Sequence, residues 1–436
     1  MHILITGASG FIGSHLARHL RAQGHTIIAG TRNSQHWQAM LPMYTWIAVD
    51  FMRDLQAEVW LPRLTQVDLV INTVGIIAER GSQNFREIQT LAPQALFSAC
   101  AQRGVKVIQI SALGADDPKL GTRFLHSKRL ADDWLWNSGC ESLILYPSIV
   151  IGRGGASTAL FEQLSALPVI PVIGDGRQRI NPIHIEDMCR VIAHLVDHWP
   201  PDRQRHQLAG PQVLSIIEFH GLLRRRLGMG KPRFLYLPPS LIHSLIRLIR
   251  PLPLQAPINE ETLTLLSESR TPAPTYTEVP IRPIAQALAQ EPVTHAEILG
   301  LHLANLRPAL FASIAFIWIF TGITSAIFDL PSGYALMRTG GIEGRLATIS
   351  IYAGALLDLI LGLLMVFNIW RRPVYLLQIG LMLGYMALAT VIVPAQWLHP
   401  FGPLTKNLPL IIATGLLWLT EPRRSTAEAW KEDRTK

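Results

Sequence analysis

Short apolar runs alternate with amphipathic stretches over the first 150 residues. Apolar or β-branched runs of roughly four to eight residues between turn residues predict buried strands, and apolar residues spaced three or four apart predict helices. Strands are expected at 3–6, 25–31, 46–49, 67–72, 106–110 and 142–146, and helices from about residue 11, over 85–103 and around residue 128. This alternation is typical of an α/β fold with a doubly wound parallel sheet of the Rossmann type.

The pattern changes after residue 307, where long apolar stretches begin. Most of these stretches hold about 20 or more predominantly apolar residues, which is enough for a helix to cross a hydrocarbon core. The last is shorter and interrupted by glycine, but Trp418 and the arginines after it provide an interfacial end. Four transmembrane helices are therefore predicted, at residues 309–328, 346–370, 374–393 and 408–420.

These patterns divide the chain into a nucleotide-binding domain at 1–300, an all-α four-helix transmembrane bundle at 301–425 and a tail at 426–436. Arg371 and Arg372 lie between the second and third spans. Further basic residues follow the fourth span, namely Arg423, Arg424, Lys431, Arg434 and Lys436. Because Lys and Arg are enriched in cytoplasmic loops, we expect a multi-pass protein of the inner (cytoplasmic) membrane with both termini in the cytoplasm. Residues 3–6 are too short for the apolar core of a secretory signal.

Composition agrees with a chain that lies partly in a membrane. Charged residues make up 16% of the chain, whereas soluble domains average about 25%. The formal charge of +8 is not gathered into a basic cluster with interleaved aromatic residues, so we expect no nucleic-acid partner. The three cysteines have neither metal nor redox spacing, so we expect reduced thiols and no metal site.

The first fifteen residues, MHILITGASGFIGSH, place three glycines between a strand and the start of a helix. Gly7 allows the tight turn, Gly10 lets backbone approach a pyrophosphate, and Gly13 lets helix and strand pack closely. The sequence therefore predicts a dinucleotide site. Its expected contacts in this stretch are Thr6, Gly7, Ser9, Gly10, Phe11, Ile12 and Gly13.

The ends of later strands extend this predicted site. Arg32 follows the second strand, where an acidic residue would bind the ribose of NAD(H); a basic residue there favours NADP(H), with NAD(H) as the alternative. Asp50 and Phe51 end the third strand and are suited to hydrogen bonding and stacking on adenine. The turn at Thr73, Val74 and Gly75 brings backbone close to the nicotinamide half.

Several further motifs follow in order, and together they resemble the atypical short-chain dehydrogenase/reductase superfamily. The motifs are TGASGFIG, Ser111 at a strand end, a helix with Lys128, YPSIVIG at 146–152 and IGDGRQRINPIHIEDM at 173–188. The branch they resemble most comprises the nucleotide-binding proteins related to the short-chain-dehydrogenase-like accessory subunit of respiratory complex I. The resemblance implies Ser111 and Lys128 as catalytic residues, and Tyr146, Pro147 and Ser148 as further cofactor contacts.

One position departs from this resemblance. The family's tyrosine, which passes a proton to the substrate oxygen, corresponds to Phe124, and phenylalanine has no proton to give. Lys128, with its pKa lowered by burial, or His126 could serve instead. Tyr146 is a second departure, because relatives commonly carry arginine there. We expect His184 and Asp187, within PIHIED, to make hydrogen bonds of a loop and a helix cap.

The membrane half resembles the DoxX-like family of four-helix proteins, on the basis of HPFGPLTKNLP at 399–409 and of Asp358 in its glycine-flanked helix. Some members of that family are linked to quinone-dependent sulfur oxidation. An acid at membrane depth is a functional-site hypothesis by default, with pairing to another helix as the structural alternative. A basic amphipathic stretch at 241–250 either lies on a bilayer surface or packs on the domain's own core.

These observations support three hypotheses. The first is an oxidoreductase that moves reducing equivalents between NADPH and a lipid-soluble or membrane-proximal substrate such as a quinone. The second is a non-catalytic module whose NADPH supports assembly or sensing in a complex with another membrane protein, which Phe124 favours. The third, transport through the bundle, is favoured only by Asp358.

Overall fold

The computed structural model describes residues 1–79, 81–119, 121–242, 244, 276, 278–328, 330–400 and 402–421. The first of its two compact units ends at Ile298, and the second begins at Leu299. The predicted amphipathic stretch at 241–250 and the tail at 426–436 lie almost entirely outside the described residues.

A parallel sheet of seven strands forms the centre of the first unit, with the order β11-β6-β5-β4-β1-β2-β3. The strands are β1 (His2–Thr6), β2 (Thr26–Thr31), β3 (Thr45–Ala48), β4 (Leu69–Asn72), β5 (Lys106–Ile110), β6 (Ser142–Pro147) and β11 (Gln204–Leu208). All neighbouring pairs are parallel. The chain reverses its direction of winding at β1, so the carboxyl ends of β1 and β4 form the crevice where such sheets bind ligands. The predicted doubly wound fold is confirmed.

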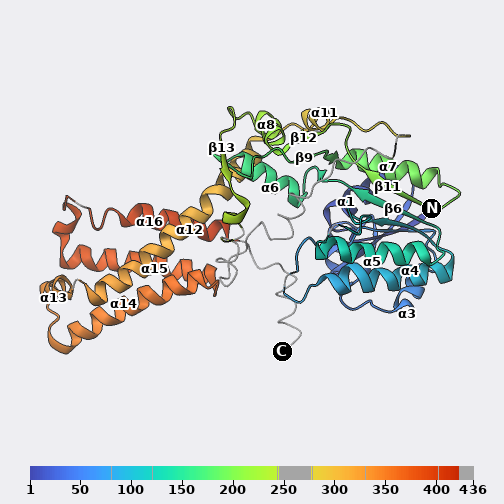
Figure 1. Ribbon diagram of the computed structural model, residues 1–436. Coiled ribbons are helices and arrows are strands. Elements are labelled where there is room, and N and C mark those ends of the chain that lie inside the picture. Colours follow the sequence, from blue (N-terminus) through green and yellow to red (C-terminus); the bar gives the residue numbers. More distant parts are fainter. Residues whose placement is uncertain are drawn as a thin grey trace. The chain divides into compact units, whose positions relative to one another are not determined.

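Helices cover both faces of this sheet, as Figure 1 shows. On one face α1 (Phe11–Ala22) and α7 (Ile185–Asp197) bury a core with the side chains of Ile3 and Ile5. On the other face α4 (Ala92–Arg103) and α5 (Arg123–Asn137) pack on Leu4 and its neighbours. The helix expected at 85–103 begins as a π-helix at Arg86–Leu91. The remaining elements on these faces are α2 (Ser34–Met40), α3 (Ala57–Trp60) and a 3₁₀ turn at Leu61–Leu64.

A smaller lobe completes the first unit with three two-stranded sheets. The pairs are β7 (Val150–Ile151) with β10 (Ile183–His184), β9 (Arg179–Ile180) with β12 (Leu214–Ser215), and β8 (Ile170–Ile173) with β13 (Phe234–Leu237). Helices α6 (Ala156–Ser165), α8 (Ile216–Arg226) and α11 (Ile284–Ala289) enclose its core. Ser215 and Glu218 form a capping box at the start of α8, which fixes where that helix begins.

A proline separates α11 from α12. Helix α11 ends at Ala289, and α12 begins only at His295. Pro292 lies between them, and proline disfavours helical backbone both at its own position and at the residue before it.

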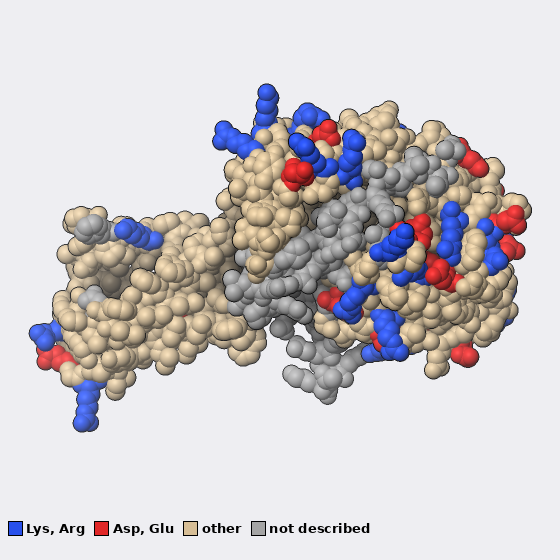
Figure 2. All heavy atoms as spheres, viewed as in Figure 1, with Lys and Arg blue, Asp and Glu red and all other residues tan. Residues whose placement is uncertain are grey.

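The second unit is helical, with α12 (His295–Ile327), α13 (Leu330–Thr339), α14 (Gly344–Val366), α15 (Arg371–Ile392), a 3₁₀ turn (Pro394–Trp397) and α16 (Asn407–Thr420). Among the described residues, three helices are long and apolar enough to cross a membrane, namely α12, α14 and α15. In Figure 2 their sides carry almost no charged side chains. The predicted fourth span is a helix of 14 residues, about 21 Å long, against a hydrocarbon core of about 30 Å.

Glycines bring the helices of this bundle close together. A Cβ on Gly322 of α12 would lie 2.8 Å from the Ala355 carbonyl oxygen of α14, and one on Gly362 would lie 3.0 Å from the Ile319 amide nitrogen. Small residues of this kind drive close helix packing in membranes. Asp358 lies on α14, and its buried Oδ1 has no hydrogen-bond partner among the described residues.

Candidate functional site

The glycine loop between β1 and α1 has no space for larger residues. Gly7 has a φ of +74°, which L side chains rarely adopt, and its Cβ would lie 2.9 Å from Thr73 Oγ1. A Cβ on Gly13 would lie 2.3 Å from the Gly7 carbonyl oxygen. Since the Gly7 oxygen also accepts a 2.8 Å hydrogen bond from the Gly10 amide, the turn is fixed by backbone contacts. Helix α1 can therefore pack this close to strand β1 only because Gly7 and Gly13 have no side chains.

The start of α1 provides amide groups without acceptors. Gly10 at the N-cap makes no side-chain cap, and the first turn holds no acidic residue. The first amides of a helix have no intrahelical acceptors, and together with the helix dipole they favour an anion. Ser9 and Gly10 are exposed, whereas Phe11 and Ile12 are half-buried. These residues fit the pyrophosphate of a dinucleotide.

The predicted adenosine side lies at the ends of β2 and β3. Ser9 Oγ lies 2.9 Å from Thr31 Oγ1, so the glycine loop and the end of β2 are in contact, and Arg32 next to them is exposed. The half-buried Asp50 accepts a 3.1 Å hydrogen bond from the Met52 amide. The Phe51 ring is buried with an edge-to-face contact to Trp60, at 5.7 Å between centroids, so it points into the core.

Lys128 lies under the predicted nicotinamide side. Its Nζ donates hydrogen bonds to the carbonyl oxygens of Ile110, at 3.1 Å, and of Val74, at 3.4 Å. A Cβ on Gly75 would lie 3.0 Å from this Nζ, so glycine leaves room for the ammonium group. Burial lowers the pKa of Lys128 to about 8, and the nearby Asp132 opposes this shift. The structure thus brings Lys128 together with the turn after β4, as the sequence leads one to expect.

A ladder of buried polar side chains crosses three strands beneath this site. Thr6 Oγ1 donates to Asn72 Oδ1 at 2.7 Å, and Asn72 Nδ2 donates to Gln109 Oε1 at 2.7 Å. Gln109 Nε2 then donates to Asp132 Oδ1 at 3.3 Å. The ladder ends at Ser111, whose Oγ donates a short hydrogen bond to Asp132 Oδ2. These five residues are all at least nine-tenths buried.

Sequence reasoning singled out Thr6 and Ser111 but missed the residues between them. A signal was present, because Asn72 and Gln109 are polar residues in strands that are otherwise apolar. Strands in the middle of a parallel sheet are buried on both faces, so a polar side chain there needs a partner. Asp132 lies four residues after Lys128 on the same helix face.

Phe124 lies on α5 one turn before Lys128 and packs in the apolar core on that face of the sheet. It is 9% exposed and makes an edge-to-face contact with Phe85, at 6.2 Å between ring centroids. His126 lies on the exposed side of α5, with Nδ1 3.0 Å from Arg129 Nη2, so it is not brought together with Lys128.

The predicted contacts after β6 are largely enclosed. Tyr146 is 1% exposed, and its hydroxyl has no hydrogen-bond partner among the described residues. Pro147 is buried, and Ser148 Oγ donates to the Asn181 carbonyl oxygen at 2.7 Å. Thr73 Oγ1 donates to the Thr6 carbonyl oxygen at 2.7 Å, which joins the ends of β1 and β4.

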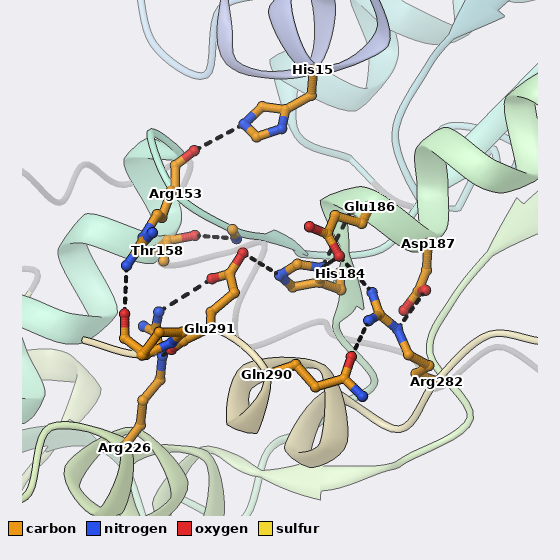
Figure 3. A network of polar contacts seen from close by, with 12 residues as sticks. His15, Arg153, Thr158, His184, Glu186, Asp187, Arg226, Arg282, Gln290 and Glu291 are labelled. Carbon is orange, nitrogen blue, oxygen red and sulfur yellow. Dashed lines mark hydrogen bonds and ion pairs between the residues drawn. The ribbon is translucent and has the colours of Figure 1, made fainter. Parts of the chain in front are cut away.

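A separate network, drawn in Figure 3, contains His184 and Asp187. The buried His184 caps α7, and its Nε2 lies 3.1 Å from Glu291 Oε1. Glu291 Oε2 lies 3.2 Å from Arg226 Nη2. Asp187 Oδ1 accepts a 2.9 Å hydrogen bond from Arg282 Nε. These contacts tie α7 and α8 to the segment around α11.

Two family models match separate parts of the chain. Residues 3–207 match the NAD dependent epimerase/dehydratase family. Residues 315–415 match a DoxX-like family. The first unit is accordingly similar to NAD-dependent epimerases and dehydratases, and the second is similar to DoxX-like proteins.

Several curated proteins are similar to the first unit. Ceramide reductase of Caulobacter vibrioides is 29% identical over 196 residues, which cover 42% of this chain and 57% of that protein. Mitochondrial NADH dehydrogenase (ubiquinone) 1 alpha subcomplex subunit 9 of Arabidopsis thaliana is 24% identical over 243 residues, covering 54% of this chain and 60% of that protein. The chain thus spans less than two thirds of the length of both relatives. Among solved structures, a UDP-glucuronic acid 4-epimerase from Bacillus cereus is 20% identical with a TM-score of 0.46, and the match covers 59% of this chain and 95% of that one.

Proposed function

We propose that this chain, which joins an NAD(P)-binding domain of the epimerase/dehydratase type to a DoxX-like membrane domain, is a membrane-anchored NADP(H)-dependent oxidoreductase. Its substrate is lipid-soluble or membrane-proximal, and a quinone or a long-chain carbonyl compound belongs to this class. The observation that carries the proposal is the position of Lys128 Nζ, 3.1 Å from the Ile110 carbonyl oxygen at the carboxyl end of β5. Ligands of open parallel sheets bind at these ends.

The bound dinucleotide would supply or accept a hydride. Lys128 and Ser111 provide two polar groups close to each other at the end of β5. Lys128 Nζ binds the Ile110 carbonyl oxygen, and Ser111 is the residue after Ile110. Phe124 has no proton to transfer, so the proton for the substrate oxygen comes from one of these two groups.

The substrate class follows from the surroundings of the site and from the second unit. Phe85 and Phe124 form an apolar wall on the side where the family has its tyrosine, which suits an apolar substrate. A membrane domain restricts the search for a water-excluded substrate to two dimensions. The similarity to a protein named ceramide reductase agrees with a lipid substrate. The basic residues Arg371 and Arg372 would face the cytoplasm, which supports our proposal of an inner-membrane protein with both termini on that side.

The test is the oxidation of NADPH by the full chain in detergent, followed by absorbance, with a short-chain quinone and with a long-chain ketone. We expect turnover with at least one of these substrates, and a smaller kcat/KM for a water-soluble ketone with the same reacting group. Phe124→Tyr should keep or raise this turnover, because it adds a proton donor beside Lys128. Tight NADPH binding without turnover in either protein would contradict the proposal and favour a non-catalytic NADPH-binding module, which Phe124 also favours.

Arg32 is proposed to select NADP(H). It is exposed, and the Ser9–Thr31 contact of 2.9 Å places it beside the glycine loop. Arg32→Asp should weaken NADPH binding and strengthen NADH binding, because a carboxylate repels the 2′-phosphate and accepts hydrogen bonds from a 2′-hydroxyl. Fluorescence titration with both dinucleotides measures the ratio of their dissociation constants. Arg103→Asp, at an exposed arginine at the end of α4 and away from the carboxyl ends of the strands, is the control. An unchanged ratio in Arg32→Asp would refute the role of Arg32.

A further inference from the structure

Ser111 and Asp132 form a buried hydrogen-bonded pair, and the catalytic residues that the resemblance implies include Ser111 but not Asp132. We propose that Ser111 delivers the proton to the substrate oxygen and that Asp132 is the positioning residue that supplies this proton. The pair would thereby take the role of the tyrosine hydroxyl, which Phe124 lacks. This inference rests on the proposed function of the domain.

Lys128 is the less suitable proton donor because two of its three ammonium hydrogens already have acceptors. Nζ donates to the carbonyl oxygens of Ile110 and Val74, at 3.1 and 3.4 Å. Proton loss from Nζ would weaken both of these hydrogen bonds, because an ionised donor binds a carbonyl more strongly than a neutral amine does. Lys128 is therefore better suited to provide a fixed positive charge and to bind these two backbone carbonyls than to exchange a proton.

Asp132 is held in one orientation by the ladder. Gln109 Nε2 donates to Oδ1 at 3.3 Å, so the other oxygen, Oδ2, faces the Ser111 hydroxyl. Gln109 cannot turn its amide around freely, because its Oε1 accepts a 2.7 Å hydrogen bond from Asn72 Nδ2. Asn72 is fixed in turn by the Thr6 hydroxyl. The hydrogen bonds from the sheet thus determine which oxygen of the Asp132 carboxyl accepts the hydrogen bond from Ser111.

Three charged or titratable groups face this carboxyl from the elements around it. They are Lys128 on α5 itself, Arg205 on β11 and Tyr146 on β6. Burial raises the pKa of Asp132 to about 6, although Ser111, Lys128, Gln109 and Arg205 oppose the shift. Asp132 is 1% exposed. Both protonation states are therefore accessible near neutral pH, as a proton relay requires.

The transfer of hydride and proton balances both for reduction of the substrate and for oxidation of the product. In reduction, the substrate carbon receives the hydride with its electron pair from the dihydronicotinamide, and the substrate oxygen takes the Ser111 hydroxyl proton. Ser111 Oγ then recovers a proton from the Asp132 carboxyl, which becomes a carboxylate and is reprotonated from solvent. In oxidation the carboxylate accepts the Ser111 proton as the serine oxygen takes the proton of the alcohol. Reduction therefore needs Asp132 protonated, and oxidation needs it ionised.

The test compares the full chain in detergent with Asp132→Asn, Asp132→Glu and the control Glu141→Gln, whose exposed side chain lies just before the start of β6. With NADPH and a long-chain ketone, kcat of the unmodified protein should fall as the pH rises through about 6. In Asp132→Asn this pH dependence should disappear and kcat should fall by about 100-fold, while the NADPH dissociation constant stays within about twofold. Asp132→Glu should restore part of the pH dependence.

A second readout does not depend on turnover. The infrared carboxyl band of a protonated buried acid should appear as the pH falls through about 6, be absent from Asp132→Asn, and shift in frequency in Ser111→Ala. If Asp132→Asn keeps the pH dependence, or loses NADPH affinity in step with kcat, the relay is wrong while the proposed function stands. If the unmodified protein shows no turnover, the proposed function fails and the catalytic relay fails with it.

Discussion

Lys128→Met is expected to reduce turnover by about 10² to 10³, because the ammonium charge that binds the Ile110 and Val74 carbonyls beside the site is lost. Methionine keeps most of the apolar stem, so the change removes charge more than volume. We expect a lower kcat with any substrate that the unmodified protein reduces. The measurement is steady-state NADPH oxidation, with Lys106→Met at the opposite end of β5 as the matched control.

Lys128→Met should also change how the free energy of unfolding depends on pH. Burial lowers the pKa of Lys128 from its ordinary value of 10.5 to about 8, so the folded protein binds fewer protons than the unfolded chain between these pH values. The free energy of unfolding should therefore rise with pH across this window, an effect that Lys128→Met should lack. A Lys128→Met protein with unchanged kcat would contradict the assigned role. A loss of activity matched by global unfolding at neutral pH would show a structural role instead.

Arg226→Met is expected to destabilise the first unit by about 3 to 5 kcal/mol. The Arg226 side chain is 9% exposed and lies between the carboxylates of Glu162 and Glu291. Its removal leaves these two carboxylates close together without the cation between them, while Glu291 keeps its contact with His184. Burial already raises the pKa of Glu162, so protonation at lower pH should recover part of the lost stability.

The control for this prediction is Arg225→Met on the same helix, where the side chain is exposed. Surface changes of that kind usually stay within about 0.5 kcal/mol. Urea unfolding followed by tryptophan fluorescence measures both variants. Equal midpoints for the two variants would show that the network in Figure 3 does not stabilise the fold.

Much of the fold could be predicted because its signals are local. The strand at Lys106–Ile110 has the predicted bounds, and the glycine spacing places the turn and the start of α1 correctly. Apolar runs also indicate the three long helices of the second unit. Each of these elements is specified by neighbouring residues, through side-chain period, chain length or a backbone position open only to glycine.

Features that depend on tertiary structure were not visible in the sequence pattern. The direction of the Phe51 ring follows from the position of Trp60 nine residues later, which fills the core on that side. The ladder from Thr6 to Asp132 depends on strand register, because Thr6 pairs with Asn72 and Asn72 with Gln109. Side chains far apart in sequence meet there only after the parallel sheet has formed.

The fate of bound NADPH tests most directly whether this chain is an NADPH-dependent oxidoreductase. The full chain in detergent, loaded with one equivalent of NADPH, is mixed rapidly with a long-chain ketone or a short-chain quinone, and dihydronicotinamide absorbance is followed through a single turnover. The account predicts that this absorbance disappears in the unmodified protein with one of these substrates and persists in Lys128→Met. Bound NADPH that stays reduced in the unmodified protein with both substrates would contradict the account.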